Sequence, residues 1–355
     1  MAARRPAERS LLAARLAAQG LSGPPATSVV EATRRLLAVQ AQDPRGARLA
    51  LRVRSTSTHA SEVDDALSRD RSLIITWVNR GTLHLIAAED EPLLHALTTP
   101  QLRTASERRL EQEGVSPAAL EGAIAGLVKA LGENGPMTRR QIRSLFERLR
   151  VPVAGQALVH ILFRATLDGL IVRGPLAGGD HAFVLGVDWL GERPGVDRDR
   201  ALAELARRYL VGHGPADERD LAKWAQVSLR DARAGLKAIA GEIVERSDGL
   251  VDLRRGQPPP LPPPRLLGPF DPIPLGWRSR GFVLADAQNV LTRNGIIRPV
   301  VLVAGRAAGT WTMPGGRVRL EMWAEPSRRV ATALACEASA IESYLAAGDA
   351  AGATR

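Results

Sequence analysis

Hydrophobic residues recur along the first part of the chain with two different spacings. Apolar side chains three and four positions apart predict three amphipathic helices within the first 70 residues or so. The spacing then changes, because residues 73–78 and 82–86 are rich in β-branched and aromatic side chains. Asn79-Arg80-Gly81 separates these two runs, and a three-residue connection containing glycine is typical of a β-hairpin. Helices followed by a hairpin are the element order of a winged helix.

The same order of helices and short strands recurs twice further along the chain. Two octads that begin at Gly135 and Gly214 align as Gly-Pro-x-(Thr/Asp)-x-Arg-(Gln/Asp)-(Ile/Leu). In each octad Gly-Pro ends one helix, and Thr138 or Asp217 caps the next one. Pairs of short strands follow both octads, near residues 170–173 and 182–185 and near 243–245 and 251–253. We therefore expect three tandem winged-helix units, over residues 1–110, 111–195 and 196–255.

The last hundred residues have a different character. Residues 256–264 are rich in proline and form a stiff linker or a chain that crosses a surface. Beyond this linker, residues 300–303, 309–313 and 318–323 read as strands joined by glycine turns, and residues 327–345 as a closing helix. The predicted fold class is α+β, with three tandem winged-helix units, a C-terminal β-rich domain over residues 256–355 and a closing helix.

Residues 36–44 carry two glutamines near a predicted helix end. Pro44 lacks a backbone donor and disfavours helical geometry for Asp43, so we expect the helix to end there. Gln40 and Gln42 would lie in its last turn, about 200° apart around the axis, so their amides can converge only if that turn is distorted or extended. A converging pair can hold a water molecule or a base edge. The alternative is two solvated glutamines near a helix end.

The charge of the chain favours a polyanionic partner. The formal net charge is +10 and the sequence pI is about 10.9, which suits nucleic acid first. The lysines are only Lys129, Lys223 and Lys237, so nearly all basic residues are arginines. Together with abundant alanine, glycine and proline, this composition also fits a GC-rich coding bias that raises the pI without any function.

Other features of the sequence argue against several classes of site. Cys336 is the single cysteine, so no intrachain disulfide is possible, and no Cys/His cluster has zinc spacing. No run of eighteen apolar residues exists. The first ten residues are basic but lack the apolar core and cleavage site of a secretory signal. We expect a cytoplasmic, nucleoid-associated protein with neither a metal nor an organic cofactor.

Several short segments, taken in order, resemble those of one enzyme family. They are Gln40-Ala41-Gln42, Trp77-Val78-Asn79-Arg80-Gly81-Thr82-Leu83-His84-Leu85, His213-Gly214-Pro215-Ala216, Phe270-Asp271-Pro272, Leu275-Gly276-Trp277, Asn294-Gly295-Ile296-Ile297-Arg298-Pro299-Val300 and Gly309-Thr310-Trp311. Together they resemble the bacterial winged-helix DNA glycosylases of the AlkZ and YcaQ type, and the resemblance covers roughly residues 10–345.

The resemblance implies three tandem winged helices and a C-terminal β-rich portion around a DNA-sized channel. It implies excision of bulky N7-alkylguanine adducts and, in some members, unhooking of interstrand crosslinks. The branch that protects producers of genotoxic natural products carries Gln-hydrophobic-Gln, and the broader branch carries Gln-hydrophobic-Asp. Gln40-Ala41-Gln42 resembles the first branch, although Ala41 is small for the middle position, and the resemblance makes Gln40 and Gln42 the catalytic residues.

The implied chemistry needs few groups. An N7-alkylated guanine already carries positive charge and leaves easily, so two amides that position a water can supply much of the catalysis. No paired acid and base carboxylates of the glycosidase kind are evident, although Asp43 and Asp271 can each add a negative charge near the sugar. Asp271 is alternatively a turn acceptor, His84 a core-edge histidine, and Trp77 a core residue rather than a base-stacking one.

Our hypothesis is a monofunctional DNA glycosylase that acts as a monomer on double-stranded DNA carrying alkylated purines. No lysine stands near the glutamine motif, which argues against a Schiff-base lyase step. The alternatives are a non-enzymatic winged-helix transcriptional regulator, for which no dimerisation heptad is visible, and a damage-binding protein without catalysis. The candidate DNA-binding residues are Arg45, Arg80, Thr82, Arg278, Arg280, Arg293, Asn294 and Arg298.

Overall fold

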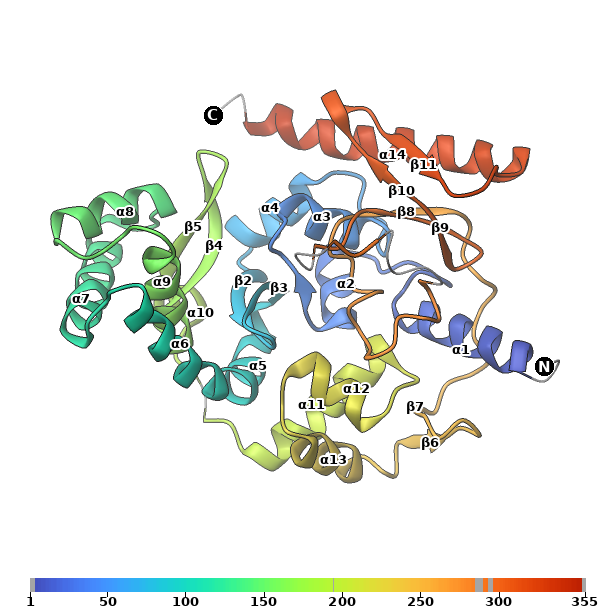
Figure 1. Ribbon diagram of the computed structural model, residues 1–355, viewed down its shortest axis with the longest axis horizontal. Helices are drawn as coiled ribbons and strands as arrows, with labels where there is room; N and C mark the ends of the chain where they lie inside the picture. Colours follow the sequence, from blue (N-terminus) through green and yellow to red (C-terminus); the bar gives the residue numbers. More distant parts are fainter. Residues whose placement is uncertain (1–3, 194, 285–289, 293–295, 353–355) are drawn as a thin grey trace. The chain divides into compact units, whose positions relative to one another are not determined.

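Helices and antiparallel strands group into two units in the computed structural model, which describes residues 4–193, 195–284, 290–292 and 296–352 (Figure 1). The first unit contains residues 1–63 and 199–355, and the second contains residues 64–198, so the second unit is an insertion in the sequence of the first. The mixture of helices with antiparallel sheets agrees with the predicted α+β class. The division into three tandem winged helices stays a prediction.

The strands of the second unit form an antiparallel sheet in the order β3-β2-β4-β5. The hairpin predicted first is confirmed, since β2 and β3 pair in register around the Asn79-Arg80-Gly81 turn. Asn79 and Gly81 have φ values of 56° and 70°, which asparagine and glycine tolerate best. The second hairpin is longer than predicted, because β4 and β5 stay paired as far as Ala177 and Asp180. A tight turn of Gly178 and Gly179, both with positive φ, joins the two strands.

The helices of the second unit enclose an apolar core that includes Trp77. This ring is 7% exposed, meets Phe163 edge-on at 5.7 Å and stacks on Phe183 at 6.4 Å between centroids, which confirms its interpretation as a core residue. The cap predicted at Thr138 is also confirmed, as part of a capping box with Gln141. Among the described residues no single helix is long and apolar enough to cross a membrane; α6 and α7 meet that test only together, with a bend of 109° between them.

The elements of the second unit follow one another closely in sequence. α4 contains the boundary at residue 63, and the 3-10 helix η1 leads from the first hairpin into α5. The bounds are α4 (Ser61–Ser68), β2 (Leu73–Val78), β3 (Thr82–Ala87), η1 (Ala88–Asp90), α5 (Glu91–Thr98), α6 (Pro100–Gln112), α7 (Pro117–Asn134), α8 (Arg139–Arg148), α9 (Ala157–Leu167), β4 (Ile171–Ala177), β5 (Asp180–Leu185) and α10 (Gly186–Leu190).

The first unit combines the N-terminal helices with everything after residue 198. Asp217 caps α12 through a 2.7 Å bond from Asp220 N, as predicted, and the two strands expected after α13 pair as β6 and β7. The bounds are α1 (Arg4–Ala18), α2 (Val29–Leu36), β1 (Val39–Gln40), α3 (Pro44–Arg52), α11 (Arg198–His213), α12 (Glu218–Ala225), α13 (Leu229–Ala238), β6 (Ile243–Glu245) and β7 (Val251–Leu253).

The C-terminal part of the first unit is β-rich, as expected, and its strands form an antiparallel sheet in the order β11-β10-β9-β8. The closing helix α14 runs beside this sheet in Figure 1, and Leu334, Ile341 and Tyr344 of α14 share a buried cluster with Leu266 and Trp311 of the sheet. The bounds are β8 (Arg265–Leu267), β9 (Val300–Val303), β10 (Arg306–Thr312), η3 (Pro314–Gly316), β11 (Arg319–Met322) and α14 (Arg328–Gly352).

The helix predicted to end at Asp43 is shorter than expected. α2 begins after its Ser28 cap and ends at Leu36, where Leu37 takes a φ of 64°. A residue with a positive φ cannot continue a right-handed helix, so the chain leaves α2 at Leu37, six residues before Asp43. Pro44 does not end a helix but begins α3, a position that suits proline because the first helical N–H has no partner within the helix.

Candidate active site

Gln40 and Gln42 lie in the connection between α2 and α3. β1 holds Gln40 in extended geometry, and side chains two positions apart in an extended chain point to the same side. The Gln40 Nε2 group donates a hydrogen bond to Gln42 Oε1 at 2.6 Å. The sequence implied that the two amides could converge only in a distorted or an extended segment. The segment is extended, so the amides meet outside any helical turn.

The two amides differ in exposure. Gln40 is 7% exposed, whereas Gln42 is exposed to solvent. Because Gln42 Oε1 accepts the bond from Gln40, the Nε2 group of Gln42 contributes two donors on the exposed side of the pair. The buried glutamine thus orients the exposed one, and the pair can present donors and an acceptor in a defined direction to a bound water.

Asp43 follows the pair directly and has a structural task of its own. Its Oδ1 atom accepts a 2.7 Å hydrogen bond from Gly46 N, so the carboxylate is the N-cap of α3. A negative charge at this place also interacts favourably with the positive end of the helix. Arg45, in the first turn of α3, is exposed and accessible to a phosphate.

Asp271 is engaged on both carboxylate oxygens. Its Oδ1 and Oδ2 atoms lie 2.7 and 2.8 Å from Nη2 and Nη1 of Arg54, and Oδ1 also accepts from Ile273 N at 3.0 Å. The bond from Ile273 confirms the turn-acceptor interpretation. Both side chains of the ion pair are almost fully buried, at 1% and 2% exposed. The pair ties the Phe270-Asp271-Pro272 motif to the end of α3.

Arg54 is a residue that our sequence analysis missed. Its guanidinium also donates to Gln19 O and Ala50 O, both at 2.9 Å. A signal for its burial is present in the sequence, since Ala50 and Leu51 lie four and three positions earlier on the buried face of α3. An arginine that continues an apolar helix face needs a buried acidic partner.

His84 is buried in the second unit, at 2% exposed. Burial, with the charge of Arg80 as the second cause, lowers the pKa of His84 to about 3 from its ordinary 6.5. The ring is therefore neutral at physiological pH. Nδ1 lies 2.9 Å from Thr82 O, and because a carbonyl oxygen only accepts, Nδ1 carries the proton. This geometry agrees with a core-edge histidine and gives no positive charge.

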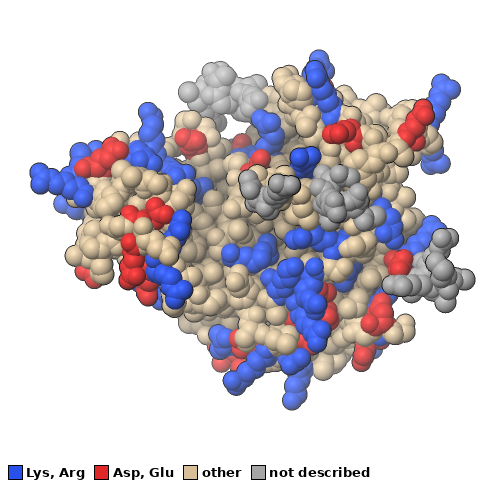
Figure 2. Space-filling model, in the orientation of Figure 1, with Lys and Arg blue, Asp and Glu red and all other residues tan. Residues whose placement is uncertain are grey.

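The remaining DNA-binding candidates differ in their exposure to solvent. Arg80 and Thr82, at the β2–β3 turn, are half-buried. Arg278 and Arg298 are exposed, whereas Arg280 is half-buried with its Nε donating to Pro274 O at 2.7 Å. Arg293 and Asn294 lie outside the described residues. On the face drawn in Figure 2, basic side chains are spread over the surface with acidic ones among them.

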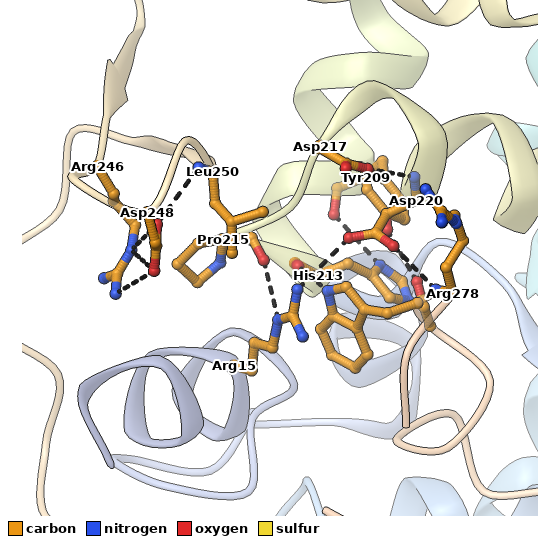
Figure 3. A network of polar contacts seen from close by, with 12 residues as sticks. Arg15, Tyr209, His213, Pro215, Asp217, Asp220, Arg246, Asp248, Leu250 and Arg278 are labelled. Atoms are coloured by element: carbon orange, nitrogen blue, oxygen red, sulfur yellow. Dashed lines mark hydrogen bonds and ion pairs between the residues drawn. The ribbon is translucent and has the colours of Figure 1, made fainter. Parts of the chain in front are cut away.

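Two further motifs meet in a buried network of the first unit (Figure 3). His213 stacks on Tyr209 with centroids 4.7 Å apart, and its backbone oxygen accepts from Trp277 Nε1 at 2.8 Å. Arg15 donates to Pro215 O at 3.0 Å and lies over the Trp277 ring at 4.7 Å. Residues 196–255 are therefore held to α1 and to the C-terminal part of the first unit. The contacts come from two motifs, His213-Gly214-Pro215-Ala216 and Leu275-Gly276-Trp277.

Asp220 completes this network and explains how Arg15 is accommodated. Its Oδ2 atom lies 3.4 Å from Arg15 Nη2, and its Oδ1 atom accepts from Arg278 N at 2.8 Å. Burial lowers the pKa of Arg15 and raises the pKa of Asp220, and each charge opposes the shift of the other. Among the described residues no group of three or more His, Cys, Asp or Glu side chains is placed to hold a metal ion.

Comparisons with known proteins agree with the resemblance. Residues 33–344 match the family model described as DNA glycosylase AlkZ-like. A curated protein of Streptomyces sahachiroi named interstrand DNA cross-link repair glycosylase is 28% identical over 337 residues, which cover 85% of this chain and 87% of that protein. The solved structure named Streptomyces sahachiroi DNA glycosylase AlkZ aligns with a TM-score of 0.76 at 25% identity, covering 95% of this chain and 96% of that one.

Proposed function

The chain belongs to the AlkZ-like DNA glycosylase family, and from this membership we propose that it hydrolyses the N-glycosidic bond of bulky N7-alkylguanine adducts in duplex DNA. We propose that its lesions include interstrand crosslinks, because the Streptomyces sahachiroi relative is named for crosslink repair. Self-resistance of a producer of a genotoxic natural product is the biological setting we propose for this activity.

Gln40 and Gln42 are the catalytic residues in this proposal. The observation that carries it is the 2.6 Å bond between a buried and an exposed amide in an extended segment. An N7-alkylated base already carries positive charge, so its departure needs no strong general acid. The amides bind one water and place it at the anomeric carbon as the C–N bond breaks, and positioning of this kind lowers the barrier without a covalent intermediate.

The neighbouring charges have weaker roles. Asp43, next to the pair in sequence, adds negative charge that favours an oxocarbenium-like transition state, while its Oδ1 caps α3. Asp271 acts as an orienting group through Arg54, since its carboxylate is shared with Arg54 and Ile273. Buried and neutral His84 keeps the core-edge interpretation and is given no part in this proposal. The water oxygen bonds to the anomeric carbon, the alkylated base leaves as a neutral molecule with the electrons of the broken C–N bond, and the surplus proton of the water passes to solvent. No enzyme amine or cofactor takes part in this balance, so we propose a monofunctional enzyme without a lyase step.

DNA binding rests on the arginines and the hairpins. We propose that the chain acts as a monomer in the cytoplasm. We also propose that it contains three tandem winged helices, over residues 1–110, 111–195 and 196–255. In each of these three stretches helices are followed by a hairpin, and one helix is capped, by Ser28, Thr138 or Asp217. The proposed contacts to the DNA backbone are Arg45, Arg80, Thr82, Arg278, Arg280, Arg293, Asn294 and Arg298.

Single-turnover excision of a defined N7-alkylguanine from duplex DNA tests the proposal. Gln40→Ala and Gln42→Ala should each slow base release roughly tenfold to a thousandfold, by analogy with the loss of one oxyanion-hole donor. Duplex affinity should change much less, because the interaction is made mainly in the transition state. The double variant should fall far short of additive loss if the amides hold one water as a unit.

A matched control and two contrary outcomes make the test specific. Gln257→Ala removes an exposed glutamine from the proline-rich linker and should leave the rate unchanged. Base release at the wild-type rate by both single variants contradicts the assignment. Trapping of a protein–DNA adduct by borohydride contradicts the hydrolytic mechanism, because direct attack by water forms no Schiff base.

A further inference from the structure

The direction of the glutamine pair depends on how the first turn of α3 is held. Gln42 is followed at once by Asp43, whose carboxylate is fixed to Gly46 N at 2.7 Å. A displacement of this turn therefore displaces Gln42. Such a displacement also stretches the 2.6 Å bond to Gln40, which belongs to the separate segment β1.

Gly46 brings this first turn into direct contact with a distant segment of the chain. A Cβ atom added at Gly46 would lie 2.4 Å from Pro269 O and 3.3 Å from the Pro269 carbonyl carbon. A Cβ atom added at Gly268 would in turn lie 3.3 Å from Gly46 Cα and 3.0 Å from Leu49 Cβ. Since Gly46 lies inside a helix, close backbone approach, and not an unusual φ, is the reason that no side chain fits there.

The same distant segment also contacts the other end of α3. Asp271, two residues beyond Pro269, forms the buried ion pair with Arg54, and Arg54 Nη1 also donates to Ala50 O in the last turns of α3. The segment is anchored in turn to the C-terminal sheet, because Leu267 O accepts from Trp311 Nε1 at 2.8 Å. Residues 268–271 therefore bind both ends of the helix that begins just after Gln42.

We propose that the 268–271 segment, through Gly46 and Arg54, is a positioning element for the catalytic amides. It touches neither water nor base itself. It sets the place of the first turn of α3, and thereby the direction of Gln42 relative to Gln40. This inference rests on the proposed catalytic role of the glutamine pair.

The test compares two glycines that meet the same obstacle. Gly46→Ala puts a Cβ atom 2.4 Å from Pro269 O, and Gly235→Ala, in α13, puts one 2.4 Å from Leu202 O. Both substitutions force a helix away from a backbone oxygen in the same unit, so both should lower the melting temperature. Only Gly46→Ala should also displace the first turn of α3, and with it Gln42.

The readout is single-turnover excision against protein concentration, which separates the saturating rate from the half-saturating concentration. Gly46→Ala should lower the saturating rate about tenfold or more, and the half-saturating concentration should stay within about threefold of wild type. Gly235→Ala should keep the saturating rate within about twofold. A folded Gly46→Ala protein with the wild-type rate overturns the inference, and so does an equal rate loss in both variants.

A second variant decides the matter if Gly46→Ala does not fold. Arg54→Lys keeps a positive charge beside Asp271 but gives up the two parallel hydrogen bonds, so the saturating rate should fall several-fold without weaker binding. A wild-type rate in that variant overturns the inference. The glutamine variants separate a failure of the proposed function from a failure of the positioning role. Wild-type rates in Gln40→Ala and Gln42→Ala refute the proposed catalytic role. A lower rate in those variants, with no lower rate in Gly46→Ala or Arg54→Lys, refutes the positioning role alone.

Discussion

Acid is expected to destabilise the second unit through one histidine, His84 on β3. Its ring is 2% exposed, and burial together with the charge of Arg80 lowers its pKa to about 3 in the folded protein. In the unfolded chain the pKa returns to about 6.5. Between these two values the unfolded state binds a proton that the folded state does not bind, so stability falls as the pH falls.

The magnitude follows from the difference between the two pKa values. Above pH 6.5 the ring is neutral in both states and contributes no pH dependence. Below that value each pH unit costs about 1.4 kcal/mol, so near pH 5 the loss from this one group is about 2 kcal/mol. The loss continues to grow until the pH reaches the folded pKa of about 3. A loss of this size is a large part of the stability of an ordinary domain.

The assay is urea unfolding followed by circular dichroism, at neutral pH and near pH 5, on wild type and His84→Asn. Asparagine can donate to Thr82 O as Nδ1 does, but it does not titrate. The variant should therefore lose about 2 kcal/mol less than wild type on acidification. His95 and His160 also have pKa values lowered by burial, and the comparison with the variant removes their contribution.

Two results would refute this reasoning. An equal loss of stability in wild type and His84→Asn would show that His84 does not couple protonation to folding. A ring that titrates near pH 6 in the folded protein, followed by NMR, would show that burial does not hold it neutral.

Two other changes have definite expected outcomes. Thr138→Ala removes the capping box of α8 and should lower the free energy of unfolding of the second unit by about 1 kcal/mol, measured by urea titration; an unchanged value would contradict the capping role. Arg80→Ala should raise the Kd for duplex DNA and flatten its salt dependence without lowering the melting temperature, because the positive φ values of the turn belong to Asn79 and Gly81; a sharp fall in melting temperature would make Arg80 structural.

Several elements could be predicted because their causes are local. The β2–β3 hairpin follows from two β-rich runs around Asn79-Arg80-Gly81, and the caps at Thr138 and Asp217 follow from side chains that bond backbone groups three residues on. The C-terminal strands and the closing helix were also predicted, since their apolar spacing and glycine turns act over a few residues. The resemblance to the glycosylase family, later confirmed, likewise came from short segments in order.

The sequence proposed the two glutamines of the candidate site, which stays a prediction, but it did not give their geometry. The sequence singled out Gln40 and Gln42 and showed that a helical turn would keep their amides apart. It wrongly placed the helix end at Asp43, because the residue that ends α2, Leu37, carries no glycine-like signal for its positive φ. Leu37 is fully buried, and burial of this side chain requires packing that a propensity at one position does not encode.

Only the tertiary structure decided what holds the site in place. Arg54 and Asp271 are 217 residues apart, and Gly46 meets Pro269 across a similar distance in sequence. Neither partner can be identified from its neighbours, because a buried charge requires a counter-charge without specifying where along the chain it lies. A glycine inside a helix signals close approach without naming the segment that approaches. Local bonds set where capped helices such as α8 and α12 start, and long-range packing sets where the first turn of α3, next to Gln42, lies.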